Sequence, residues 1–191
     1  MANLNELSED LNYVAGAVHR GQRRPVPTIL ALWAVLVPIG FALADFAPAW
    51  CAPYWLVAGI LGGVASGLIG RAMSIRHGLR DARLSRRYSL HWLAMWAAYI
   101  LFGASVATGH MDARTTVPIW LLLSALAYTL AGIHLDHDKA FLPSGIIMFL
   151  GYAALVWLPL PYMWTTTGLI VSVSLIVAAV RSARVTRSAE R

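Results

Sequence analysis

Residues 59–70 read GILGGVASGLIG, an uncharged apolar run in which small residues recur at every fourth position. Gly59, Gly63 and Gly67 form one row, and Gly62, Ser66 and Gly70 form the row beside it. This pattern is typical of a transmembrane helix, because small side chains let helix backbones approach closely where lipid supplies no hydrophobic drive for association. We therefore expect this helix at the centre of a membrane bundle. Its glycine faces pack either within one chain or between copies in a homo-oligomer.

The composition places the chain in the membrane class. Of its 191 residues 59% are apolar and only 13% are charged, and the mean hydropathy is +0.63, outside the usual range of soluble domains. The single cysteine, Cys51, excludes an intramolecular disulfide and a zinc site with several cysteines. We expect a transmembrane domain at residues 25–181, between a cytoplasmic amphipathic helix with a basic linker at 1–24 and a basic tail at 182–191.

The hydropathy pattern predicts an all-α fold, a polytopic bundle of six transmembrane helices of roughly 20 residues each, the length that crosses a bilayer. The expected spans are residues 28–47, 53–70, 90–109, 117–133, 141–158 and 161–180. Pro38 lies within the first span, where it should bend the helix near Ala34. The segments LALWA at 30–34 and LAMWA at 93–97 each precede a glycine by the same interval. This repeat indicates three consecutive helical hairpins, or else arises by chance in so biased a composition.

The distribution of charge predicts the orientation. Of the 15 lysines and arginines, all but Arg114 lie near the termini, between residues 71 and 87, or at position 139. By the positive-inside rule these segments and both termini are cytoplasmic. The preference for arginine over lysine suggests a bacterium, so we expect a multi-pass protein of the inner membrane. An aromatic belt at the outer interface would consist of Trp50, Trp55, Trp120, Trp157 and Trp164.

Two cytoplasmic segments predict contacts at or beyond the membrane surface. Residues 4–20 place leucine and valine on one helical face, so this helix lies on the bundle or the headgroups, or binds a cytoplasmic protein partner. The loop at 71–89 should continue the second span as a helix whose arginines attract anionic lipid headgroups. These arginines are Arg76, Arg80, Arg83 and Arg87. We do not expect nucleic-acid binding, because no aromatic stacking platform accompanies the arginines.

Asp45 is the exception to the near absence of ionisable residues within the spans. It lies about one turn from the outer end of the first span. Its carboxylate either accepts a hydrogen bond from a tryptophan or tyrosine of the outer belt, or forms a cation or proton site, because an intramembrane charge needs a partner.

A segment rich in histidine and aspartate follows the fourth span. If the helix continues through it, His134, His137 and Asp138 share one face at metal-ligand spacing, and His91 at the start of the third span supplies a further ligand. The same residues also make an ordinary polar turn between two spans. The sequence leaves any cofactor unknown.

These features favour a non-enzymatic membrane protein that binds or relays. It would act on a protein partner through residues 4–20 and the basic loop, or hold a small apolar ligand between helices. No catalytic constellation is evident, since Ser66 has no histidine at membrane depth to activate it. The first alternative is a small-solute permease or channel, which the hairpin repeat and Pro38 support. The second is a metal-dependent membrane enzyme that uses the histidine and aspartate cluster.

Overall fold

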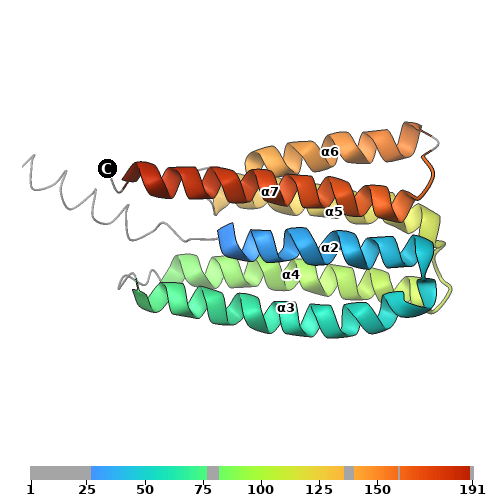
Figure 1. Cartoon of the computed structure of the whole chain (residues 1–191), viewed down its shortest axis with the longest axis horizontal. Coiled ribbons are helices and arrows are strands. Elements are labelled where there is room, and N and C mark those ends of the chain that lie inside the picture. Colours follow the sequence, from blue (N-terminus) through green and yellow to red (C-terminus); the bar gives the residue numbers. More distant parts are fainter. Residues whose placement is uncertain (1–26, 77–81, 136–139, 159, 190–191) are drawn as a thin grey trace, which may run out of the picture.

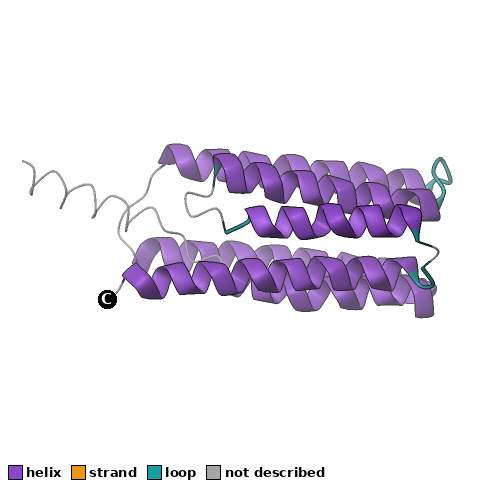
Figure 2. Ribbon diagram, turned by 90° about the horizontal axis from the view of Figure 1, so that it is seen from above, coloured by secondary structure: helices purple, strands orange, loops and turns teal. Residues whose placement is uncertain are grey.

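The chain forms a bundle of helices that run side by side (Figure 1 and Figure 2). The computed structural model describes residues 27–76, 82–135, 140–158 and 160–189, and these contain no strand. The six helices are α2 (Pro27–Phe46), α3 (Pro48–Arg76), α4 (Ala82–Ala107), α5 (Ala113–His134), α6 (Leu142–Trp157) and α7 (Met163–Ala189). The amphipathic helix expected at residues 4–20 lies outside the described residues.

Five of these helices are long and apolar enough to cross a membrane, and α6 is a shorter apolar helix of 16 residues. This agrees with the predicted helical bundle of a multi-pass membrane protein. The helix ends differ from the expected spans at both ends of the bundle, since α3 begins at Pro48 rather than at residue 53 and α5 begins at Ala113 rather than at residue 117. The predicted continuation of the second span is confirmed through Arg76, whereas residues 82–89 belong to α4.

The helices do not pack in chain order. The most extensive contact joins α2 to α7, and the next joins α5 to α6. In Figure 1, α2 lies between α7 and α3. Among the described residues, α3 packs chiefly on α2, and α4 packs chiefly on α5. Each expected hairpin is a contacting pair, but the two largest contacts join helices from different hairpins.

The glycine-rich helix α3 lies at the periphery of the bundle, so the prediction that it forms the centre is wrong. Only 17% of its apolar window is buried, against 39% for α5. One row of small residues does meet α2: Trp33 Nε1 donates a 3.0 Å hydrogen bond to Ser66 Oγ, and a Cβ added at Gly62 would lie 3.1 Å from the Trp33 ring. A Cβ added at Gly63, Gly67 or Gly70 would meet no described atom within 4 Å, and one added at Gly59 would lie 3.8 Å from the Trp96 ring.

Close helix packing depends on glycines in other helices. A Cβ added at Gly168 of α7 would lie 2.8 Å from Phe41 Cβ of α2. A Cβ added at Gly132 of α5 would lie 2.6 Å from the backbone nitrogen of Leu142 at the start of α6. Neither glycine has another glycine four residues away. A repeat of small residues permits two helix backbones to approach closely, but the approach occurs only where another helix packs against that face.

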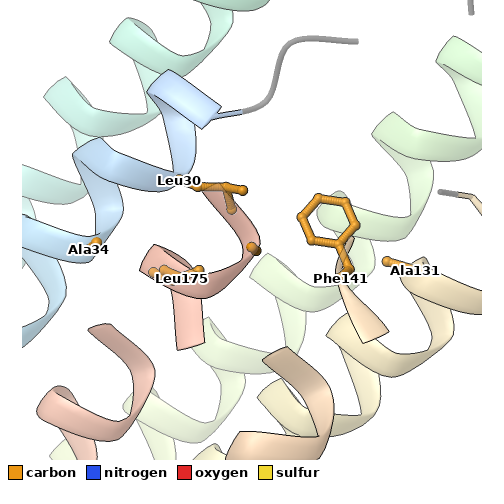
Figure 3. Packing of buried hydrophobic residues seen from close by; sticks show 6 residues of the cluster. Leu30, Ala34, Ala131, Phe141 and Leu175 are labelled. Carbon is orange, nitrogen blue, oxygen red and sulfur yellow. The ribbon is translucent and has the colours of Figure 1, made fainter. Parts of the chain in front are cut away.

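Two clusters of buried side chains form the core. In the first, Phe141 lies just before α6 and reaches the space between α2, α5 and α7 (Figure 3). Its cluster consists of Leu30, Ala34, Ala131, Phe141, Leu175 and Ala178. The second cluster joins α5 to α6 and consists of Val117, Leu121, Ala125, Met148 and Leu155. The core therefore lies between α2, α5, α6 and α7, and neither cluster includes a residue of α3 or α4.

Candidate functional site

Polar side chains of the apolar helices gather where α2 meets α7, and we call this contact the α2–α7 interface. It consists of Leu30, Ala34, Pro38, Phe41 and Asp45 of α2 and Thr165, Gly168, Ser172 and Leu175 of α7. From Leu30 to Asp45 the interface extends about 22 Å along the helix. The first and the last apolar helices are thereby joined over most of their common length.

A proline creates one polar contact of this interface. Pro38 has no N–H, so the carbonyl oxygen of Ala34 lacks its usual partner four residues later. Ser172 Oγ of α7 donates a hydrogen bond to this oxygen at 2.6 Å. From the other side, the hydroxyl of Tyr54 in α3 donates to Leu36 O at 2.7 Å. Helix α2 continues through Pro38, and the Ser172 hydroxyl replaces the donor that Pro38 lacks, as an apolar environment requires. The Tyr54 hydroxyl adds a further bond to a carbonyl that Pro38 does not affect.

A second contact depends on the absence of a side chain at position 168. Gly168 faces both Phe41 and Pro38, and an added Cβ would lie 3.0 Å from Pro38 Cα. The two backbones therefore approach closely next to the residue where α2 lacks a helical hydrogen bond. Gly168 and Ser172 are one turn apart on the same face of α7, so the steric contact and the hydrogen bond support each other.

Asp45 forms the third contact, at the opposite end from Leu30. Its Oδ2 atom accepts hydrogen bonds from the backbone N–H and from Oγ1 of Thr165, each at 2.7 Å. Thr165 lies in the first turn of α7, where backbone N–H groups have no partner in the helix and negative charge is favourable. The partner is therefore not the tryptophan or tyrosine that we expected. Asp45 instead caps α7 from the neighbouring helix, and the cation or proton site remains a prediction.

Three of the five tryptophans expected in an outer belt point into the bundle. The ring centroid of Phe41 lies 5.9, 6.0 and 5.6 Å from those of Trp55, Trp120 and Trp164. Such tilted and edge-to-face pairs add specific contact energy to burial. Trp120 Nε1 is buried without a hydrogen-bond partner in the described part of the chain. Trp50 and Trp157 remain exposed, as a belt requires.

The two described histidines of the expected metal site have different surroundings. His91 Nε2 lies 3.1 Å from Ala127 O, and a carbonyl oxygen can only accept, so this nitrogen carries the proton. His134 is the last residue of α5 and is exposed. His137 and Asp138 lie outside the described residues, within which no three potential ligands are close enough for a metal ion. The metal site remains a prediction.

The expected lipid-binding arginines lie at the ends of α3 and α4. Arg76 is the last residue of α3, Arg83 lies in the first turn of α4, and Arg87 follows one turn later with its side chain exposed. Arg80 lies outside the described residues. The described part of the basic segment thus belongs to two helices, and the position of Arg87 relative to α5 follows from the packing of α4.

A shallow apolar hollow of about 350 Å³ lies between α2 and α3. Its lining includes Leu32, Leu36, Val57 and Leu61, and its single polar group is Tyr54, whose hydroxyl already donates to Leu36 O. The hollow therefore offers apolar contact and no free donor from Tyr54. It could accept only a ligand that needs no hydrogen bond from it.

Sequence analysis missed the α2–α7 interface, although a signal for it exists. Thr165, Gly168, Ser172 and Leu175 recur at intervals of three and four, which places them on one face of the last span. Because of Pro38, the carbonyl oxygen of Ala34 needs a hydrogen-bond donor from another helix. Ser172 is one of several serines and threonines that could have supplied it. The pairing of Ala34 with Ser172 could not be predicted, because no local sequence pattern connects two positions so far apart in the chain.

No protein-family model, no curated protein and no solved structure matches this chain.

Proposed function

We propose that this chain is a non-enzymatic integral membrane protein that relays a change between a partner-binding N-terminal segment and its C-terminal part. It crosses the inner membrane of a bacterium six times as three hairpins, with both termini in the cytoplasm. The amphipathic segment at residues 1–24 binds a cytoplasmic protein, and the basic residues at the inner surface contact anionic headgroups.

The observation that carries this proposal is the α2–α7 interface. The N-terminal segment leads directly into α2, and α7 extends to Ala189 and so includes most of the basic tail expected at residues 182–191. These two helices form the most extensive helix contact among the described residues. A force on the N-terminal segment therefore acts first on the helix that is most closely joined to the tail.

Close packing makes such coupling physically reasonable. Packed helices shift as units between discrete arrangements, because cores do not deform continuously. The hydrogen bond from Ser172 and the close approach at Gly168 lie next to Pro38, where α2 has lost one of its own hydrogen bonds. A partner shifts the equilibrium only as far as it binds one arrangement more tightly than the other.

Hydrogen exchange of the full chain in lipid nanodiscs tests the relay. Changing Leu7→Asp and Leu11→Asp together removes the apolar face of the N-terminal segment. We expect altered amide exchange in residues 176–189 of α7, and a smaller alteration when Ser172→Ala is also present. The turn at residues 108–112, remote from both helices in the chain, is the control and should not change. Unaltered exchange at 176–189 would refute the relay.

The apolar hollow between α2 and α3 favours a second function, the binding of a small apolar ligand. Leu61 lines the hollow and is 63% exposed, so Leu61→Phe should fill it without disturbing the core. Leu68→Phe is the matched control, because Leu68 is 61% exposed on the same helix and is not part of the lining. We expect a brominated decane to quench tryptophan fluorescence saturably. Leu61→Phe should weaken this quenching, and Leu68→Phe should leave it unchanged. Equal quenching in both variants would exclude this site.

The solute permease, the metal-dependent enzyme and association through the exposed glycines of α3 remain predictions. No contact within the described ranges favours one of them over the others.

A further inference from the structure

We infer that the basic end of the α4–α5 contact is a binding site for the phosphate of an anionic phospholipid. The inference rests on the membrane orientation proposed above, which places this end of the bundle at the cytoplasmic surface. It goes beyond a general attraction of arginines to headgroups, because it assigns the contact to one side of two particular helices.

Two hydrogen bonds fix how α4 lies against α5. His91 Nε2 donates to Ala127 O at 3.1 Å, and the hydroxyl of Tyr99 lies 2.6 Å from Ser124 Oγ. The helices are antiparallel (Figure 1), so residues that precede His91 lie beside residues that follow Ala127. Arg87 is one turn before His91, and His134 is two turns after Ala127. The register therefore brings Arg87 and His134 to the same end of the contact.

The helical repeat also places these two side chains on the same side. Residues four apart share a helix face, which puts Arg87 on the face of His91. Residues seven apart also share a face, which puts His134 on the face of Ala127. Both Arg87 and His134 are exposed. A permanent cation and an imidazole N–H donor thus face the same region from two helices, and phosphate is the anion that an arginine side chain binds with matching geometry.

Apolar surface continues from this site along both helices. Leu90 of α4 is 53% exposed, and Leu130 of α5 is 46% exposed. Each lies within about a turn of the polar pair, on the side toward the middle of the helices. A phospholipid matches both parts, with its phosphate at Arg87 and His134 and an acyl chain along the leucines. A soluble phosphate would use only the first part, so charge and apolar surface together favour the lipid.

Native mass spectrometry of the full chain in mild detergent tests the site with dioleoyl phosphatidylglycerol as the probe. We expect more of this lipid to be retained than of dioleoyl phosphatidylethanolamine. Arg87→Gln should lower the lipid-bound fraction about fivefold, the effect of one cation near an anionic surface, and His134→Leu should lower it at least about twofold. Arg87→Lys keeps the charge and should retain most of the binding, which separates loss of the site from loss of the fold.

Arg86→Gln is the matched control. It removes the same charge from the neighbouring, exposed residue, which the helix turns about 100° away. An unchanged lipid-bound fraction in Arg86→Gln supports a defined site, and an equal loss in both variants would overturn it. Glycerol phosphate at the same concentration should not displace the lipid, and displacement would show that the headgroup alone is bound. Ser172→Ala should leave lipid binding intact, so failure of the relay and failure of this site are distinguishable.

Discussion

Ser172 Oγ donates a 2.6 Å hydrogen bond to the carbonyl oxygen of Ala34, the atom that Pro38 leaves without its partner in α2. The two residues are 138 positions apart in the chain. Their contact joins the first apolar helix to the last one at the point where the first lacks a helical hydrogen bond. The stability of the bundle should therefore depend on this pair more than on the repeated glycines of α3.

Removing the Ser172 hydroxyl should leave the Ala34 oxygen unpaired in an apolar environment. We expect Ser172→Ala to lower the free energy of unfolding by about 1–2 kcal/mol, measured by steric trapping in bicelles. Pro38→Ala restores the N–H that pairs with Ala34 O, so Ser172→Ala should cost less in that background. An equal cost in both backgrounds would contradict the role of Pro38. Ser105→Ala is the control, because the Ser105 hydroxyl donates to Leu101 O of its own helix rather than to a neighbouring helix.

Glycine substitutions should separate close packing from mere repetition. Gly168→Leu places a side chain against Pro38 and Phe41 and should destabilise the bundle by about 2–3 kcal/mol. Gly67→Leu on α3 has open space around it among the described residues, and we expect little effect. Thermal unfolding of both variants in nanodiscs compares them directly. If Gly67→Leu proved the more damaging, the exposed face of α3 would have a partner in the membrane.

The cap that Asp45 provides for α7 should depend on charge and on hydrogen bonding separately. Asp45→Asn keeps an acceptor oxygen for Thr165 and loses the charge at the helix N-terminus, which should cost about 0.5–1 kcal/mol. Asp45→Ala removes the acceptor as well and should cost about 1–2 kcal/mol. Hydrogen exchange at residues 163–168 reports the cap locally. Identical exchange in wild type and Asp45→Ala would show that the cap contributes nothing.

The hydrogen bond between Trp33 and Ser66 should contribute measurably to the attachment of α3 to α2, beside the bond from Tyr54 to Leu36 O. Ser66→Ala removes the acceptor of Trp33 Nε1 and should cost about 0.6 kcal/mol, the mean for such bonds between membrane helices. Trp33→Phe removes the donor. A double-mutant cycle of the two changes measures their coupling, and additive losses would mean that the bond contributes no stability.

The sequence by itself determined the class of the fold and the position of most helices. Long uncharged runs permit only helices that satisfy their own backbone groups in lipid. The flanking charges mark where the apolar part of each helix ends, although α3, α4 and α7 continue as helices beyond that point. It also located Pro38 and Asp45 as exceptions within the first span, because each violates a local rule for an apolar helix. These are properties of single segments, which depend on composition and on the helical repeat alone.

The tertiary structure decided which helices are neighbours and what the exceptions contact. The repeat of small residues in α3 would look the same whether or not another helix packs against it. The sequence therefore led us to predict a central position for a helix that lies at the edge of the bundle. The pairing of Ala34 with Ser172 and of Asp45 with Thr165 joins positions more than a hundred residues apart. In lipid, apolar faces do not select their partners by hydrophobicity. For α2 and α7, the close backbone approach at Gly168 and the hydrogen bonds of Ser172 and Thr165 specify the pairing.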